Sequence, residues 1–219
     1  MSRLGLPDDI RACLFDLDGV LTDTAAVHRA AWKDVFDPIV AARGQQPFSE
    51  QDYLLHVDGK PRRDGVRDFL TSRGIALPEG EPDDPPEAET VAGVGNRKNV
   101  LILERLRTDG VVVFEGTADY LSRAREAGLR TAVVTSSANG EEVVRVAGLA
   151  DLIEDRVDGV VAQRDGLPGK PAPDTFLAAA RLLGVEPAAA AVFEDALAGV
   201  AAGRAGGFGF VVGIDRGDQ

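Results

Sequence analysis

The sequence IRACLFDLDGVLTDTAAVH, residues 10–28, combines a short apolar run with closely spaced acids. The run Ala12–Phe15 ends in two aspartates one residue apart, Asp16 and Asp18, and a glycine follows directly. Burying acids at the end of a hydrophobic strand costs free energy unless something there needs them. The stretch therefore predicts a buried strand whose carboxyl end carries a functional site.

Five apolar runs have the composition of strands that are buried on both faces of a sheet. They are Ala12–Phe15, Thr131–Val134, Val157–Val161, Ala190–Phe193 and Phe208–Val212. Helical patterns alternate with the last four runs, at Gly116–Ala127, Glu141–Ala147, Pro173–Leu183 and Ala196–Ala205. This alternation predicts an α/β fold, with a Rossmann-like three-layer αβα core around a parallel sheet.

A long segment separates the first run from the next core elements. It has roughly 85 residues, too many for a structureless loop in a compact domain. Helical patterns within it cover Ala25–Arg43, Glu50–His56, Asp64–Arg73 and Asn96–Leu106. The acidic, proline-rich stretch LPEGEPDDPPEAET, residues 77–90, is typical of a solvated loop. We therefore expect a helical cap domain at residues 25–108, inserted into a core domain made of residues 1–24 and 109–219.

The composition argues against several classes of partner. The chain has 219 residues and a formal net charge of −12, so nucleic acid and anionic membranes would be repelled, whereas a small phosphorylated sugar needs only a local positive pocket. No apolar run approaches the roughly 18 residues that span a bilayer, and the N-terminus lacks the features of a signal peptide. The single cysteine, Cys13, cannot form an internal disulfide. We expect a cytoplasmic monomer or weak dimer.

Polar side chains follow the predicted strands, and ligands bind open parallel sheets beyond the carboxyl ends of the strands. These side chains are Asp16 and Asp18 after the first run, Thr135, Ser136, Ser137 and Asn139 after the second, Lys170 after the third, and Glu194 and Asp195 after the fourth. Four acids this close together would repel one another without a cation. Hard oxygen ligands favour Mg²⁺, which we expect as the cofactor.

The order of these motifs resembles the haloacid dehalogenase-like superfamily of phosphotransferases. DLDGVLTDT is similar to its first motif, Thr135 to its second, Lys170 with the following PAPD to its third, and Glu194–Asp195 to its fourth. Dehalogenase relatives lack a carboxylate at the position of Asp18. The resemblance therefore favours phosphoryl transfer over dehalogenation.

The resemblance also implies a role for each core residue. Asp16 would attack phosphorus to form an aspartyl-phosphate, and Asp18 would act as general acid and base. Mg²⁺ would be held by Asp16, the backbone carbonyl of Asp18 and Asp195, with Glu194 assisting. The phosphoryl oxygens would be bound by Thr135, Ser136 and Lys170.

Within the superfamily, the stretches DTAAVHRAAW, VDGKPRRDGVRDFL, GNRKN and SSANG resemble the β-phosphoglucomutase-like family. GNRKN is taken to end the loop segment. The resemblance implies a set of substrate-binding residues: His28, Trp32, Gly59, Arg62, Lys98, Ser137 and Asn139. Asp58 is a departure, because sugar-phosphate mutases often have a lysine before the cap glycine.

Several of these residues also have a structural interpretation. Trp32 could be a core residue of the cap. Ser137 and Asn139 could cap the helix that begins near Gly140. Of the adjacent Arg62 and Arg63, at least one is expected to be solvated.

Three functions remain open from the sequence. The first is a Mg²⁺-dependent β-phosphoglucomutase that interconverts β-glucose 1-phosphate and glucose 6-phosphate. The second is a sugar-phosphate phosphatase, in which water accepts the phosphoryl group. The third is a catalytically silent binding protein, which would require the loss of a core motif, and none is lost.

Overall fold

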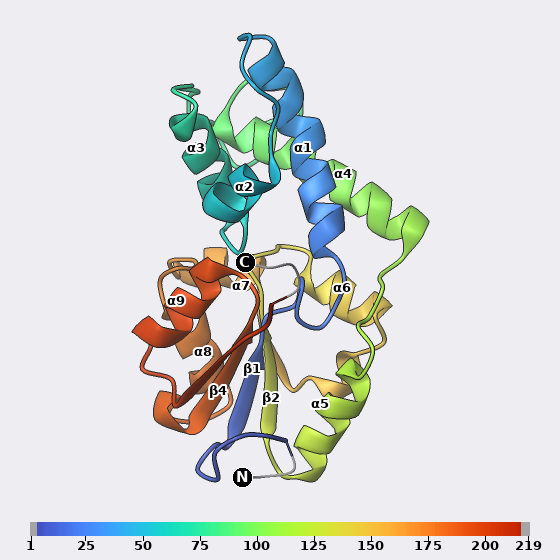
Figure 1. Cartoon of the computed structure of the whole chain (residues 1–219), viewed down its shortest axis with the longest axis vertical. Helices are drawn as coiled ribbons and strands as arrows, with labels where there is room; N and C mark the ends of the chain where they lie inside the picture. Colours follow the sequence, from blue (N-terminus) through green and yellow to red (C-terminus); the bar gives the residue numbers. More distant parts are fainter. Residues whose placement is uncertain (1–3, 216–219) are drawn as a thin grey trace. The chain divides into compact units, whose positions relative to one another are not determined.

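The computed structural model of the protein describes residues 4–215. The chain divides into two compact units. The first combines the chain up to Asp23 with the chain from Val111 onward, and the second is Thr24–Gly110. The first unit contains the sheet, and the second is helical (Figure 1). Within the described range, no helix has both the length and the apolar character needed to cross a membrane.

The first unit is built on a parallel sheet. Its strands are β1 (Ala12–Phe15), β2 (Arg130–Val134), β3 (Asp155–Val157), β4 (Ala190–Glu194) and β5 (Phe210–Gly213). Their spatial order is β3-β2-β1-β4-β5. Phe15 of β1 lies opposite Val133 on one side and Phe193 on the other. The next two strands along the chain, β2 and β3, therefore lie on one side of β1, and the last two, β4 and β5, lie on the other. β1 is therefore the switch point at which such sheets bind ligands, and the predicted α/β fold is confirmed.

Helices cover both faces of the sheet. They are α5 (Thr117–Glu126), α6 (Gly140–Val146), α7 (Gly159–Asp165), α8 (Asp174–Leu182) and α9 (Leu197–Ala205), with short 3₁₀ turns at Ala150–Leu152 and Pro187–Ala189. On one face, Leu14 packs in a core with Phe176 of α8 and Ala202 of α9. On the other face, Tyr120 of α5 meets the ring of Phe15 edge-on, with 6.1 Å between centroids. Figure 1 shows α5 and α8 on opposite sides of the strands.

The expected strand Val157–Val161 is wrong over most of its length. β3 is Asp155–Val157, and Val160 and Val161 belong to α7. The side chain of Asp158 accepts hydrogen bonds from the backbone N–H groups of both valines at 3.0 Å, which starts a helix there. A short apolar run fits a strand and a buried helical turn equally well, so periodicity could not separate them.

The second unit has its own core. Its helices are α1 (Ala25–Ala41), α2 (Glu50–Asp52), the π-helical turn η1 (Tyr53–Val57), α3 (Arg62–Ser72) and α4 (Val91–Asp109). The ring of Trp32 stacks on Phe36 with 5.0 Å between centroids, and Phe69 lies 4.2 Å from Phe36 on the same measure. Aromatic rings from α1 and α3 therefore join these helices through a dry cluster.

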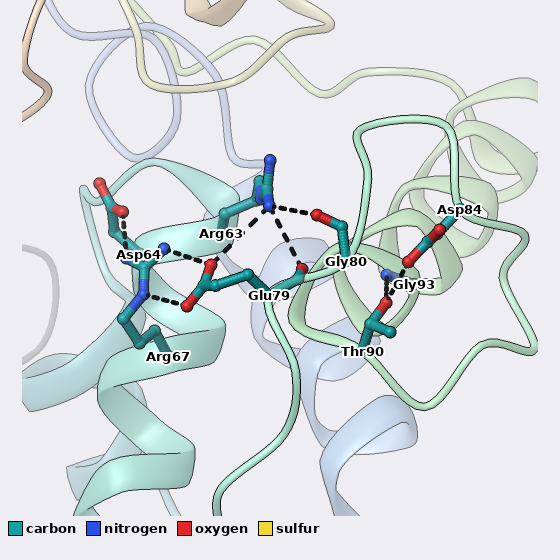
Figure 2. Close-up of polar contacts among 8 residues, drawn as sticks. All are labelled: Arg63, Asp64, Arg67, Glu79, Gly80, Asp84, Thr90 and Gly93. Carbon is teal, nitrogen blue, oxygen red and sulfur yellow. Dashed lines mark hydrogen bonds and ion pairs between the residues drawn. The ribbon is translucent and has the colours of Figure 1, made fainter.

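Residues 77–90 form a loop without helix or strand, as predicted. Figure 2 shows that ion pairs hold it in place: Arg67 of α3 donates to both carboxylate oxygens of Glu79 at 2.8 Å. At the other end of the loop, Thr90 caps α4 by accepting a hydrogen bond from the N–H of Gly93 at 2.9 Å. The loop is thus fixed at both ends.

Because of this cap, α4 begins at Val91 rather than at the predicted Asn96. Arg97 and Lys98 lie inside the helix, where the expected helix from Asn96 already placed them, whereas the interpretation of GNRKN as the end of the loop segment is wrong. The first turn of α4 could not be predicted from sequence because it contains Gly93 and Gly95, and glycine has a low helix propensity. A Cβ at Gly93 would come within 2.4 Å of the carbonyl oxygen of Ala88, so close packing requires glycine there.

Candidate active site

Asp16 lies at the carboxyl end of β1. Its backbone N–H donates to the carbonyl of Phe193 at 2.9 Å, so the residue is fixed by the central strand pair. Its side chain is buried, and one oxygen, Oδ1, accepts a hydrogen bond from Nζ of Lys170 at 2.5 Å. The structure therefore brings a buried carboxylate and a buried ammonium together at the switch point.

The ammonium of Lys170 is surrounded by oxygen atoms. Nζ donates to Asp16 at 2.5 Å, to Oε1 of Glu194 at 2.5 Å and to the backbone carbonyl of Val134 at 3.0 Å. A lysine has three N–H donors, so each has an acceptor. The ammonium is consequently locked in one orientation between β1, β2 and β4.

Glu194 is fully buried, and both of its carboxylate oxygens are hydrogen-bonded. Oε1 accepts from Lys170, and Oε2 accepts from the backbone N–H of Ala196 at 2.8 Å. Gly199 of α9 makes room for this carboxylate, because a Cβ there would come within 1.7 Å of Oε1. The geometry suits a residue that holds Lys170.

The charges of this cluster shift two pKa values in the same direction. Burial raises the pKa of Asp16 well above its usual range, and the carboxylates of Glu194, Asp195 and Asp18 raise it further, against the opposing effect of Lys170. Burial alone would lower the pKa of Lys170, but Asp16 and Glu194 outweigh it and raise that pKa. One ammonium among four acids leaves excess negative charge. A bound cation would relieve it.

Thr135 and its loop lie beside Asp18. The hydroxyl Oγ1 of Thr135 is 3.4 Å from Oδ2 of Asp18 and accepts a hydrogen bond from the N–H of Ser137 at 3.1 Å. Ser137 Oγ in turn accepts from the N–H of Asn139 at 3.2 Å. Asn139 precedes α6, but its side chain makes no capping hydrogen bond. Ser136 is half-buried in the same loop.

Asp195 lies against the turn that follows β1. Gly19 has a backbone φ of +93°, and a Cβ on it would come within 1.8 Å of Oδ2 of Asp195. Glycine is therefore required both for the backbone conformation and for the approach of the carboxylate.

The donor set suits Mg²⁺ better than a metal that needs a full protein cage. Among residues 4–215, no group of three or more His, Cys, Asp or Glu side chains is arranged to hold a metal ion by itself. Mg²⁺ typically takes one or two carboxylates and completes its octahedron with water and substrate phosphate. Asp16, Asp195 and the backbone carbonyl of Asp18 can supply such a partial set, and the excess negative charge favours it.

Three of the predicted substrate-binding residues gather within the second unit. Lys98 Nζ is 2.9 Å from Nδ1 of His28 and 5.0 Å from the ring centroid of Trp32. An ammonium can only donate, so with charged Lys98 the Nδ1 atom accepts and Nε2 of His28 carries the proton. Trp32 is only 4% exposed and belongs to the aromatic core, as its structural interpretation proposed.

Gly59 and Arg62 lie on either side of the turn before α3. Gly59 has a φ of +67°, and Arg62 is the first residue of α3. Arg62 donates to Asn96 Oδ1 at 3.4 Å, and burial lowers the pKa of its guanidinium. Arg63 instead donates to the carbonyls of the 77–90 loop, and its side chain is 39% exposed (Figure 2). The adjacent arginines therefore have different surroundings.

Sequence reasoning missed the residues that support this site. Gly19 and Gly199 make room for the carboxylates of Asp195 and Glu194 because they have no side chain. Asp158 lies at the start of α7, next to the loop of Thr135. The glycine in DALAG could have signalled a close contact, because glycine inside a helix usually has a packing reason. Nothing in the pattern around Asp158 gave such a signal.

Comparison with known proteins identifies the family of this chain. The family model of the haloacid dehalogenase-like hydrolases matches residues 10–207. A β-phosphoglucomutase of Mycobacterium bovis is 57% identical, over 97% of this chain and 84% of that protein. Hexitol phosphatase A of Escherichia coli is 30% identical, over 89% of this chain and 78% of that protein. The crystal structure of CbbY from Rhodobacter sphaeroides with xylulose-(1,5)bisphosphate has a TM-score of 0.71 and 26% identity, covering 96% and 90% of the two chains.

Proposed function

Because the chain belongs to the haloacid dehalogenase-like hydrolase family, we propose that it is a Mg²⁺-dependent β-phosphoglucomutase of the cytoplasm. It would interconvert β-glucose 1-phosphate and glucose 6-phosphate through a bisphosphate. The observation that carries the proposal is a buried carboxylate, Asp16, held by Lys170, with the second acid Asp18 beside Thr135. The 57% identity to a β-phosphoglucomutase supports the choice of substrate.

Asp16 would be the nucleophile. One of its carboxylate oxygens forms a bond to phosphorus while the bond from phosphorus to the ester oxygen breaks, which gives an aspartyl-phosphate. The contact with Lys170 fixes the carboxylate rotamer and places a positive charge where the phosphoryl group gains negative charge. The free hydroxyl of β-glucose 1-phosphate then takes the phosphoryl group from Asp16, which forms the bisphosphate. Transfer of the other phosphoryl group of this bisphosphate back to Asp16 releases glucose 6-phosphate.

Asp18 would move the proton. It donates to the departing sugar oxygen in the first step and removes the proton from the attacking hydroxyl in the second. The hydroxyl of Thr135, 3.4 Å from Asp18, would bind a phosphoryl oxygen, together with Ser136. Two acids that are one residue apart would thus take different roles.

Mg²⁺ would screen the negative charge of the phosphate so that a carboxylate can attack it. We assign Asp16, Asp195 and the backbone carbonyl of Asp18 as the protein ligands. Glu194 was also expected near the ion, but both of its oxygens are hydrogen-bonded, so we now assign it to holding Lys170.

The substrate's second phosphate needs donors of its own. We assign this role to Arg62, with Ser137 and Asn139, because a guanidinium matches phosphate with two parallel hydrogen bonds. His28 and Lys98 are assigned to the sugar and the transferring group, and Gly59 to the turn that precedes Arg62. Trp32 would support Lys98 from the core of the second unit, since their contact is 5.0 Å from ammonium to ring centroid.

Product analysis tests this function. Wild-type protein is incubated with β-glucose 1-phosphate, Mg²⁺ and a trace of glucose 1,6-bisphosphate, and phosphorus NMR follows the products. We expect glucose 6-phosphate with little inorganic phosphate. Stoichiometric phosphate without glucose 6-phosphate would instead support a sugar-phosphate phosphatase, an alternative favoured by the 30% identity to a hexitol phosphatase.

Paired variants of the adjacent arginines test the distal phosphate site. Arg62→Ala should lower mutase turnover about tenfold to a hundredfold, as expected for the loss of a charge-assisted contact of about 1.5–3 kcal/mol. Hydrolysis of acetyl phosphate, which has no second phosphate, should be spared. Arg63→Ala is the matched control, because Arg63 binds loop carbonyls. Equal losses in both variants would contradict the assignment.

A further inference from the structure

The loop after β2 is held by residues that take no part in the proposed chemistry. This loop, Thr135–Asn139, carries the hydroxyls assigned to phosphate, and it packs against the corner between β3 and α7. We propose that Asp158, at that corner, is a positioning residue for the phosphate-binding loop. The proposal rests on the proposed function for its effect on turnover.

Asp158 is a buried carboxylate, and both of its oxygens accept hydrogen bonds. It is 2% exposed. Oδ1 accepts from the backbone N–H groups of Val160 and Val161 at 3.0 Å, and Oδ2 accepts from Nε of Arg156 at 2.7 Å. A buried carboxylate is costly unless it is paired and hydrogen-bonded, and this one is both. Its three bonds fix the direction in which the chain leaves β3.

The corner touches the loop through its backbone. The N–H of Gly159 donates to the carbonyl of Ser137 at 2.9 Å, and the N–H of Thr135 donates to the carbonyl of Val157 at 3.0 Å. Asp158 lies between these two contacts. A change in its backbone would therefore be transmitted to both ends of the segment from Thr135 to Ser137.

The packing at this corner leaves little room for a compensating shift. A Cβ on Gly159 would lie 2.8 Å from the carbonyl oxygen of Ser136. A Cβ on Gly140 would lie 2.8 Å from Cγ2 of Thr135 and 3.0 Å from Cβ of Asp158. The loop is thus packed closely against Gly140 and Gly159, and Asp158 lies next to both of them.

Arg156 links Asp158 to α6, which follows the loop. Besides its bond to Asp158, it donates through Nη2 to Oε2 of Glu141 in the first turn of α6 at 3.2 Å. Glu141 is exposed, so this second contact contributes less than the first. The pair Arg156–Asp158 is therefore the part of the network on which the loop depends.

Two substitutions at Asp158 separate its contributions. Asp158→Asn keeps an acceptor for the N–H groups of α7 but loses the charge that holds Arg156, whereas Asp158→Ala loses both. With β-glucose 1-phosphate and Mg²⁺, kcat should fall about tenfold to a hundredfold in Asp158→Ala, the loss expected when a binding group is misplaced by about 1 Å. The fall should be smaller in Asp158→Asn, and KM should change less than kcat in both.

Glu154→Gln is the matched control. Glu154 also links β2 to β3 by accepting from an arginine and a backbone N–H, Arg130 Nε at 2.6 Å and Thr131 N at 3.2 Å. Arg130 and Thr131 are the first two residues of β2, at the end of the strand opposite the loop. Glu154→Gln should therefore leave kcat unchanged. An equal loss in this variant, or wild-type kcat in Asp158→Ala, would overturn the proposal.

Amide hydrogen exchange gives a readout that does not depend on activity. The N–H groups of Ser137 and Gly159 are both hydrogen-bonded at the loop, so they should exchange faster in Asp158→Ala than in wild type, and not in Glu154→Gln. Unchanged exchange at both amides would contradict the positioning role. If wild type turned over no sugar phosphate, the proposed function would fail while the exchange result still decided the role of Asp158.

Discussion

Replacing Glu194 by glutamine should lower both the free energy of unfolding and the turnover, because both oxygens of this carboxylate accept hydrogen bonds. The carboxylate is fully buried and accepts from Lys170 Nζ at 2.5 Å and from Ala196 N–H at 2.8 Å. Glutamine has one acceptor oxygen and one amide NH₂ group. Either the ammonium or the backbone N–H must then face a second donor.

The magnitude follows from what remains around Lys170. Removing one partner of a buried ion pair typically costs about 3–5 kcal/mol. Lys170 keeps its bonds to Asp16 and to the carbonyl of Val134, so the lower end, about 3 kcal/mol, is expected for Glu194→Gln. Turnover should fall as well, because Lys170 loses the partner that orients it.

The assay is urea unfolding of metal-free protein, with mutase turnover measured in parallel. Glu154→Gln is the control, because Glu154 pairs with Arg130 near the surface and such pairs contribute about 0–1 kcal/mol. If the free energy of unfolding of Glu194→Gln falls by less than about 1 kcal/mol and turnover stays at the wild-type value, the proposal that Glu194 holds Lys170 is refuted.

Three further outcomes are expected. Asp18→Asn should slow turnover of sugar phosphates far more than hydrolysis of an aryl phosphate, whose leaving group needs little protonation, and equal losses in steady-state assays would mean that Asp18 is structural. Trp32→Ala should lower the free energy of unfolding by about 3–5 kcal/mol in urea titrations, because its ring lies in the core of the second unit, and an unchanged midpoint would contradict that packing. The raised pKa of Lys170 stabilises the protein fully below the ordinary lysine pKa of about 10.4 and less as pH rises above it, so unfolding free energy should decline there more steeply in wild type than in Lys170→Met.

The predicted site in the sheet could be assembled from sequence because its residues directly follow strands. Asp16, Thr135 and Glu194 each end or immediately follow an apolar run, and the carboxyl ends of parallel strands share one edge. Lys170 was found through its motif, and its three acceptors in the structure explain its burial. Position after a strand was therefore sufficient to place Asp16, Thr135 and Glu194, whereas Lys170, which follows α7, required its motif.

Features that depend on tertiary contacts were not accessible from sequence. Val160 and Val161 have the composition of a strand, and only the bonds to Asp158 make them helical. The start of α4 depends on the Thr90 cap and on packing against Ala88, which override the low helix propensity of two glycines. The periodicity of apolar residues indicates burial and helix or strand propensity, but it does not indicate which atoms form tertiary contacts.

The central claim is that Asp16 carries the phosphoryl group, and chemical trapping tests it most directly. Wild-type protein is mixed with glucose 1,6-bisphosphate and Mg²⁺, quenched in acid, and reduced with borohydride, which converts an acyl phosphate to an alcohol. Mass spectrometry of the peptides should then locate the reduced residue at Asp16, and Asp16→Asn should give neither reduction nor turnover. Reduction at another residue, or substantial turnover by Asp16→Asn, would contradict the account.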